Sequence, residues 1–125
     1  MNKIKILLID DESEFTSTLA ERLEIRGYDA KTTDSGETGI ELIQNGNFDI
    51  AILDLLMPGM SGLETLRQIK IINTALPVIL LTGHGSTKEG VEGMRIGAAD
   101  YLMKPLDIND LMVKINEVLN TSESV

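Results

Sequence analysis

The sequence predicts an α/β fold in which a five-stranded parallel sheet is flanked by five helices. Apolar runs of four to six residues recur at intervals of roughly 20 to 28 residues, and runs this short are typical of strands. The segments between them carry apolar residues three or four positions apart, as amphipathic helices do. Strands and helices that alternate five times are typical of a parallel sheet with helices on both faces. The predicted strands lie at 4–9, 29–33, 49–53, 77–81 and 100–103.

The strands differ in how apolar they are, and this difference predicts their order. The runs 4–9, 49–53 and 77–81 are almost wholly apolar, whereas 29–33 and 100–103 mix polar and apolar residues. Strands that are covered on both faces read as continuous apolar runs, and edge strands do not. The pattern favours the order 2-1-3-4-5, with its topological switch point between the first and third strands.

Terminal signals support two of the helices in particular. In the first, Phe15, Leu19 and Leu23 stand four apart, and Gly27 follows in a position suited to a left-handed C-terminal cap. In the last, Asp107 stands at the N-cap. The predicted helices lie at 13–26, 36–45, 60–73, 86–96 and 107–120.

Length and composition indicate one globular domain, 1–125, with a core at about 3–120 and a polar tail at 121–125. The absence of Cys excludes disulfides, thiolate zinc sites and thiol nucleophiles. The formal charge of -9 opposes direct binding to nucleic acid. The first apolar run is cut short by Asp10 and Asp11, so we expect no signal peptide or membrane span, no membrane partner, and a cytoplasmic location.

Polar side chains stand where four of the strands are predicted to end. Asp10 and Asp11 follow the first strand, Asp54 follows the third, Thr82 the fourth and Lys104 the fifth. Ligands of open α/β sheets bind at the carboxyl ends of the strands beside the switch point. Any one of these residues is also explained by the fact that strand ends meet water. The set of three acids, a hydroxyl and an ammonium favours a functional site.

Three carboxylates on one edge indicate a cation and phosphoryl chemistry. Carboxylates so close to one another repel, and a proton or a cation has to neutralise part of their charge. Mg²⁺ binds carboxylate oxygens together with a phosphate oxygen and waters. An ammonium such as Lys104 and a hydroxyl such as Thr82 neutralise phosphoryl oxygens. Asp54 is alone at its strand end, and we predict it to be the nucleophile that forms an aspartyl phosphate.

Four motifs in this order and spacing resemble the receiver domain of bacterial two-component response regulators, over essentially the whole chain. The resemblance implies the flavodoxin-like receiver fold, and phosphoryl transfer to Asp54 from the phosphohistidine of a sensor histidine kinase. It further implies control of an output domain or downstream protein, and a possible homodimer through the fourth helix, fifth strand and fifth helix. The motifs are LIDDE at 8–12, DLLMPGMSG at 54–62, LTGHG at 81–85 and GAADYLMKP at 97–105.

The resemblance also assigns roles to individual residues. It implies that Mg²⁺ is bound by Asp10, Asp11, Asp54 and the backbone carbonyl of Leu56, and that Thr82 and Lys104 bind the phosphoryl oxygens. It pairs Thr82 with Tyr101 as a switch, and it implies a cis peptide before Pro105. Taken without the resemblance, Tyr101 is more often an edge-strand packing residue, and a trans peptide is far commoner.

Three residues are expected to modulate the lifetime of the phosphoryl group. Leu56 is two residues after Asp54 and is apolar, so it cannot orient a hydrolytic water, and we expect slow autodephosphorylation. His84 is positioned to donate to the phosphoryl group, although a lone loop His is more often exposed and inert. Gly83 leaves room for Thr82 to approach, or serves only the turn. Beyond accepting and slowly losing the phosphoryl group, the chain is not expected to be an enzyme.

The helix at 86–96 is expected to be the least stable of the five. It opens with a capping box from Ser86 to Glu89, and then carries Gly90 and Gly93 in its interior. Each interior Gly costs about 1 kcal/mol relative to Ala. We hypothesise that this helix is ordered or shifted on phosphorylation; the alternative is that the glycines allow close packing.

Other readings of the same residues remain. A phosphatase of the haloacid dehalogenase class also uses an Asp nucleophile with Mg²⁺, but it needs a second Asp where this chain has Leu56. A flavin module of the same strand order is disfavoured because Asp10, Asp11 and Glu12 would repel the flavin phosphate. A third reading keeps the fold as a phosphorylation-independent interaction domain, which the complete site argues against.

Overall fold

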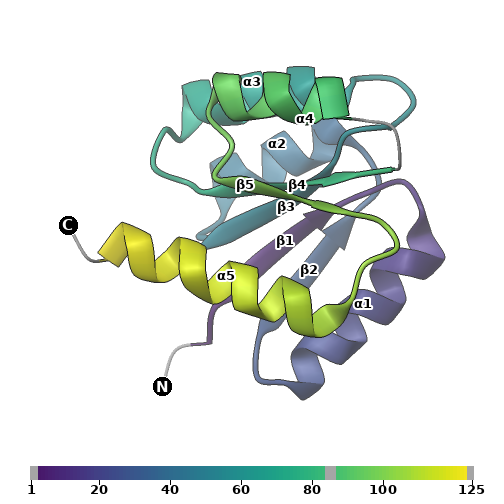
Figure 1. Cartoon of the computed structure of the whole chain (residues 1–125), viewed down its shortest axis with the longest axis vertical. Coiled ribbons are helices and arrows are strands. Elements are labelled where there is room, and N and C mark those ends of the chain that lie inside the picture. Colours follow the sequence, from purple (N-terminus) through teal and green to yellow (C-terminus); the bar gives the residue numbers. More distant parts are fainter. Residues whose placement is uncertain (1–2, 84–86, 124–125) are drawn as a thin grey trace.

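Five parallel strands form the sheet in the order β2-β1-β3-β4-β5 in the computed structural model, which describes residues 3–83 and 87–123 (Figure 1). This confirms the predicted fold class and strand order. The strands are β1 Lys5–Ile9, β2 Asp29–Thr33, β3 Ile50–Asp54, β4 Val78–Thr82 and β5 Asp100–Met103. The helices are α1 Ser13–Ile25, α2 Gly36–Asn45, α3 Gly62–Ile72, α4 Thr87–Ile96 and α5 Ile108–Glu123.

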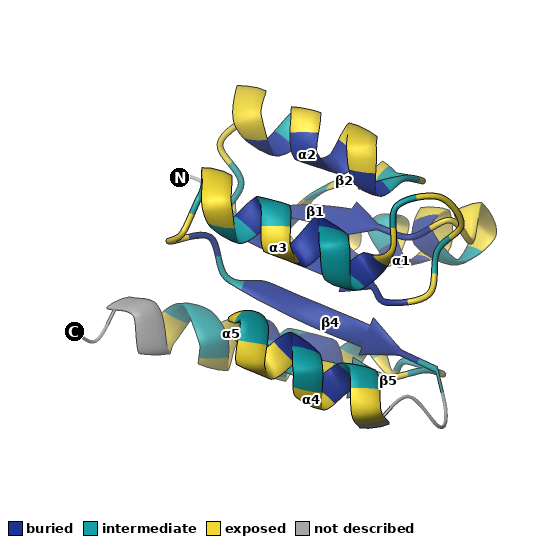
Figure 2. Ribbon diagram, turned by 90° about the horizontal axis from the view of Figure 1, so that it is seen from above, coloured by how far each residue is buried: buried dark blue, intermediate teal, exposed yellow. Residues whose placement is uncertain are grey.

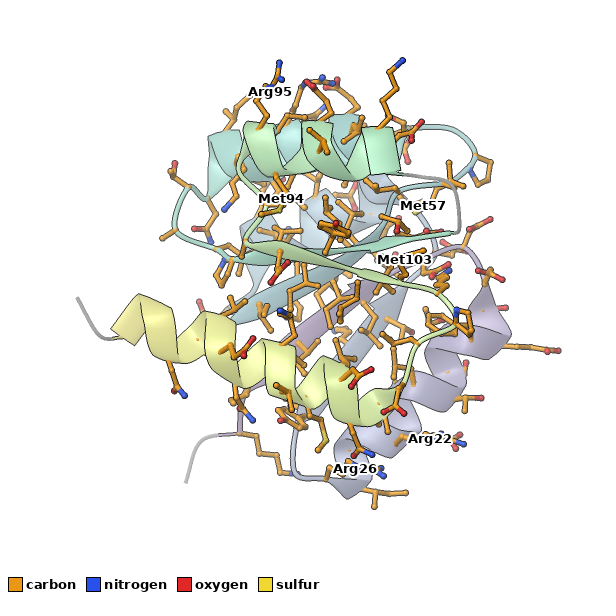
Figure 3. The ribbon with its side chains drawn as sticks, in the orientation of Figure 1. Arg22, Arg26, Met57, Met94, Arg95 and Met103 are labelled. Carbon is orange, nitrogen blue, oxygen red and sulfur yellow. The ribbon has the colours of Figure 1, made fainter. Side chains whose placement is uncertain are left out.

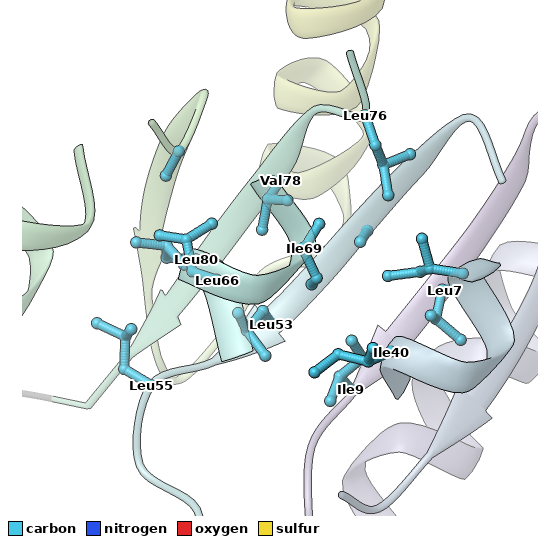
Figure 4. Packing of buried hydrophobic residues seen from close by; sticks show 13 residues of the cluster. Leu7, Ile9, Ile40, Leu53, Leu55, Leu66, Ile69, Leu76, Val78 and Leu80 are labelled. Carbon is cyan, nitrogen blue, oxygen red and sulfur yellow. The ribbon is translucent and has the colours of Figure 1, made fainter. Parts of the chain in front are cut away.

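The sheet separates two layers of helices. α1 and α5 cover one face, and α2, α3 and α4 cover the other (Figure 1). Successive residues of a strand point to opposite faces, so β1 contributes Leu7 and Ile9 to the cluster under α2 and α3, and Ile6 and Leu8 to the cluster under α1 and α5. Figure 4 shows the first of these clusters, in which Leu53 and Leu80 of the sheet lie against the helical layer.

Burial separates the central strands from the edges, as predicted. Every residue of β3 and β4 is buried, whereas β2 and β5 contain only half-buried and exposed residues. Figure 2 shows the same contrast for the helices, whose inner sides are buried and whose outer sides are exposed. A fully buried aliphatic side chain contributes about 1.5–3 kcal/mol relative to an exposed one, so β1, β3 and β4 supply much of the hydrophobic stabilisation.

Both predicted helix signals are confirmed. After α1, Gly27 has φ +95°, its N–H donates to the carbonyl of Glu24, and the N–H of Tyr28 donates to that of Leu23, which is a Schellman cap. Before α5, Oδ1 of Asp107 accepts from the N–H of Asn109 at 2.7 Å. The predicted capping-box residue Ser86 lies outside the described residues.

Three boundaries differ from the prediction in a way that matters. Asp54 and Thr82 are the last residues of β3 and β4 and do not follow them, because each extends its strand ladder by one residue opposite Leu81 and Met103. α5 continues to Glu123, three residues beyond the predicted end.

The glycines of α4 allow close packing on the sheet. A Cβ at Gly93 would lie 2.2 Å from Cδ1 of Leu80, whereas one at Gly90 would contact the ring of Tyr101 at an ordinary 3.8 Å. Close packing therefore accounts for Gly93.

Lys70 contacts the two turns that precede β4 and β5, at the amino ends of these strands. Nζ of Lys70 donates to the carbonyls of Leu76 at 2.7 Å and Thr74 at 3.4 Å. Its methylene stem lies where a Cβ at Gly97 would contact it at 3.7–3.8 Å. Burial lowers the pKa of Lys70.

Candidate functional site

The fold brings the predicted polar residues together at the carboxyl edge of the sheet. Asp10 follows β1, Asp54 ends β3, Thr82 ends β4 and Lys104 follows β5. Each of these strands except β5 pairs with another on both sides, and the N–H of Lys104 donates to the carbonyl of Thr82 at 2.8 Å. Asp10, Asp54 and Thr82 are only 2–4% exposed. The prediction that four strand ends converge is confirmed.

Lys104 is the centre of the ion pairs in this site. Its Nζ lies 2.8 Å from Oδ2 of Asp10, 2.5 Å from Oε1 of Glu12 and 3.8 Å from Oδ2 of Asp54. Burial lowers the pKa of Lys104, but hydrogen bonds to Asp10 and Glu12 and the charge of Asp54 outweigh it and leave the pKa raised. The lysine therefore carries its positive charge at neutral pH.

Asp54 is the most strongly perturbed acid in the site. Burial, followed by the negative charge of Asp10, raises its pKa from 3.8 to about 6, although Lys104 and the N–H of Leu56 act in the opposite direction. Oδ1 of Asp54 accepts that N–H at 3.4 Å. The carboxylate is therefore ionised at neutral pH and only partly compensated, which suits a nucleophile and a ligand for a cation.

The acids that lie together differ from those predicted. Ligand atoms of Asp10, Glu12 and Asp54 lie within 4.8 Å of one another, whereas Asp11 is exposed and is outside that group. Asp11 still acts on the site through its charge, which adds to the raised pKa of Asp54. Three carboxylates in this space fit a hard cation with oxygen ligands.

Asp10 is oriented by its own backbone turn. Its Oδ1 accepts the N–H of Glu12 at 2.9 Å, and its Oδ2 accepts from Nζ of Lys104 at 2.8 Å. Both oxygens are thus fixed in direction, and each keeps a further lone pair for a cation.

The other predicted residues differ in how exposed they are. Thr82 is buried, whereas Tyr101 is 39% exposed and Leu56 is 60% exposed. Among the described residues, none outside its chain neighbours would lie within 4 Å of a Cβ at Gly83. The Lys104–Pro105 peptide is cis, as the resemblance implied. His84 lies outside the described residues.

Sequence reasoning missed two members of the site, Glu12 and Phe15. Glu12 pairs with Lys104, and the ring of Phe15 has its centroid 4.7 Å from Nζ of Lys104. Glu12 could have been suspected because it continues the acidic run after the first strand. Phe15 had no such signal, because its spacing with Leu19 and Leu23 already explained it as a packing residue.

The comparisons with known proteins agree with this fold. The model of the response regulator receiver domain family matches residues 6–116. The chain therefore belongs to the response regulator receiver domains, the receiving modules of two-component systems, which interact with histidine kinases and output domains.

Curated relatives are bacterial transcriptional regulators. CpxR of Escherichia coli (strain K12) is 38% identical over 94% of this chain and 50% of its own length. YkoG of Bacillus subtilis, described as an uncharacterized transcriptional regulatory protein, is 37% identical over 95% of this chain and 52% of its own. The chain thus spans about half the length of these relatives.

A solved structure of matching length is similar throughout. The response regulator receiver domain protein from Clostridium thermocellum is 38% identical and superposes with a TM-score of 0.90. The match covers 95% of this chain and 96% of that one. Within the described residues, no helix has the length and apolar character needed to cross a membrane.

Proposed function

We propose that this domain accepts a phosphoryl group on Asp54 from the phosphohistidine of a sensor histidine kinase, with Mg²⁺ as cofactor, and thereby controls an output partner. The observation that carries the proposal is the burial of Asp54, whose pKa is about 6, beside Lys104. A buried, partly compensated carboxylate at an acidic cluster is arranged for a reaction that brings a cation and a phosphoryl group to it.

The transfer requires little chemistry from the side chains. A carboxylate oxygen of Asp54 forms a bond to phosphorus while the bond from phosphorus to the imidazole nitrogen breaks, and the imidazole leaves. Lys104 and Thr82 neutralise the phosphoryl oxygens. When bound, Mg²⁺ neutralises the developing negative charge, and its ligands would be Asp10, Asp54, the carbonyl of Leu56, and Asp11 or Glu12.

Two adjoining hollows beside the site suit a docked donor. One, of about 470 Å³, lies next to Lys104, and the other, of about 380 Å³, extends along α1. Phe15 and Leu106 contribute to both, so the hollows form one partly apolar surface that leads to the phosphoacceptor. The first is lined by Glu12, Phe15, Gly83, Lys104, Pro105 and Leu106.

A second surface suits the output partner. Val91 and Met94 of α4 and Tyr101 and Met103 of β5 are each 39–54% exposed, and Figure 3 labels the two methionines. Exposed apolar residues on neighbouring elements are typical of an interaction surface. In this proposal Thr82 and Tyr101 move together on phosphorylation and reshape this surface, which also serves a homodimer formed with α5.

The relatives suggest the setting of this output. Because they are transcriptional regulators about twice as long as this chain, we propose a cytoplasmic regulator in which a further domain contacts DNA. This chain, with its charge of -9, would not bind DNA itself.

The test is incubation with Mg²⁺ and acetyl phosphate, followed by intact mass. We expect an adduct of about 80 Da, the mass of a phosphoryl group, formed on wild type. The variant Asp54→Ala should form none, and the exposed control Asp34→Ala should behave as wild type. Turnover of phosphate esters would instead support a phosphatase, and no adduct in the presence of Mg²⁺ would support a phosphorylation-independent interaction domain.

Slow autodephosphorylation has its own test at Leu56. Its side chain is 60% exposed, so Leu56→Asn should fold normally while adding an amide that orients a water. We expect a several-fold shorter phosphoryl lifetime. This effect is smaller than the roughly 10²-fold or more of a positioned acid-base group, because the amide only orients the water. Leu56→Met is the control, and an unchanged lifetime in Leu56→Asn would contradict the prediction.

A further inference from the structure

The ammonium of Lys104 contacts two side chains from the start of α1, Glu12 and Phe15. Neither takes part in the bond-making step, although Glu12 is a candidate Mg²⁺ ligand and Phe15 lines the proposed docking surface. Nζ of Lys104 lies 2.5 Å from Glu12, 4.7 Å from the ring centroid of Phe15 and 3.8 Å from Asp54. Asp54, the acceptor, is therefore the most distant of the three acids around Nζ, since Asp10 lies at 2.8 Å.

Glu12 is also in a position where helix stability would favour another residue. It is the N-cap of α1, and its side chain makes no capping hydrogen bond. Ser, Thr, Asp and Asn are the preferred residues there, because their short side chains accept from the first N–H groups of the helix. The carboxylate of Glu12 is directed to Lys104, so its role is not helix capping.

An ammonium has three N–H donors, and two of them are already used on acids. One is directed to the buried Asp10, and the other to Glu12, whose side chain is 62% exposed. The third N–H remains, but Nζ lies 3.8 Å from Oδ2 of Asp54, beyond hydrogen-bond distance. The ammonium has to move away from Glu12 to approach Asp54 closely, so Glu12 and a phosphoryl group on Asp54 favour different positions of Lys104.

We propose that Glu12 and Phe15 form a holding site for the ammonium of Lys104, which competes with the phosphoryl group and lowers the rate of phosphorylation. Both are positioning residues that act through Lys104. This inference rests on the proposed function, since it assumes that Lys104 binds a phosphoryl group at Asp54.

The first test uses a donor too small to depend on docking of a protein. With phosphoramidate and Mg²⁺, Glu12→Gln should phosphorylate two- to fivefold faster than wild type, the factor expected for a partly exposed ion pair. Phe15→Leu should be about twofold faster, as expected for a lost cation–π contact, and Phe15→Tyr should match wild type.

Glu12→Ser separates this role from a structural one. Serine removes the carboxylate but supplies an N-cap, so the variant should melt at or above the wild-type temperature and still phosphorylate faster. In the Lys104→Met background, Glu12→Gln should change the rate no further. The ¹³Cε signal of Lys104 should shift in Glu12→Gln before any donor is added.

The outcomes distinguish this inference from the proposed function. If wild type forms no adduct on Asp54, the proposed function fails. If wild type is phosphorylated and Glu12→Gln is equally fast, only the holding site is overturned. If Glu12→Gln is slower and binds Mg²⁺ more weakly, Glu12 is a metal ligand and the holding site is likewise overturned.

Discussion

Leu53 and Asp54, neighbours at the end of β3, are buried almost equally and act on stability in opposite directions. Leu53 is 0% exposed and packs in the core, and Asp54 is 4% exposed in the acidic site. Removal from water stabilises an apolar side chain and destabilises an ionised one. The body of the strand therefore stabilises the fold, whereas its carboxyl end lowers the stability because it holds a buried charge.

The largest effect is expected from Leu53→Ala. A cavity in a packed core should lower the free energy of unfolding by about 2–5 kcal/mol. Urea denaturation measures this change. Ile25→Ala is the matched control, because Ile25 is 82% exposed and its truncation should change stability by less than about 0.5 kcal/mol.

In the absence of divalent cations, Asp54→Asn should raise the free energy of unfolding. The change of pKa from 3.8 to about 6 corresponds to as much as about 3 kcal/mol of destabilisation when Asp54 is ionised. Because the folded pKa is the higher one, this destabilisation is absent below pH 3.8, develops between pH 3.8 and about 6, and is complete above that. The variant should therefore melt higher than wild type at pH 7 and equally at pH 3.5.

Mg²⁺ provides the control for this second prediction. It should raise the melting temperature of wild type and of the exposed-acid variant Asp34→Asn, but not that of Asp54→Asn. A wild type that is more stable than Asp54→Asn at pH 7 without cations would contradict the proposed contrast between Leu53 and its neighbour.

The glycines of α4 sharpen the comparison through substitutions that leave the charge unchanged. Gly93→Ala forces Leu80 to move, since the new Cβ would lie 2.2 Å from its Cδ1, and we expect a net loss of about 1 kcal/mol from overpacking. Gly90→Ala meets only ordinary contacts with Tyr101 and should gain about 1 kcal/mol from helix propensity. Thermal denaturation should place the two variants on opposite sides of wild type.

The smallest effect is expected at an ion pair outside the site, between Asp100 and Lys114, whose atoms lie 2.7 Å apart. Burial raises the pKa of Asp100, but hydrogen bonds from Lys114 and the N–H of Tyr101 outweigh it and lower the pKa below 3.8. Its contribution is therefore present above pH 3.8 and is lost as the pH falls through the lowered pKa. Asp100→Asn should lose less than about 1 kcal/mol at pH 7, and this loss should shrink as the pH falls below 3.8.

Most of the fold could be predicted from local patterns. Strand order followed from the contrast between apolar and mixed runs, because burial on both faces is written into the composition of a strand. Gly27 and Asp107 marked helix ends because each satisfies backbone groups within a few residues. Asp54 and Thr82 were placed one residue outside their strands, since polar residues usually follow a strand and seldom end it inside the ladder.

Most members of the site were predictable, with Glu12 and Phe15 as exceptions, and the contacts between them were less so. Convergence of Asp10, Asp54, Thr82 and Lys104 follows from topology. Which acid meets Lys104 depends on the turn after β1, where Asp10 accepts the N–H of Glu12 and Asp11 is left exposed. Such directions are set by three-dimensional packing, and sequence spacing does not contain them.

The ammonium of Lys70 has a consequence for the distance between two functional side chains. It ties the turn before β4 through Thr74 and Leu76, and its stem rests against Gly97 in the turn before β5. Because β4 and β5 begin at these turns and end at Thr82 and beside Lys104, one side chain contacts the origins of both strands. This contact adds to the β4–β5 ladder, which at its other end, some five residues or about 16 Å away, joins the residues that carry the hydroxyl and the ammonium.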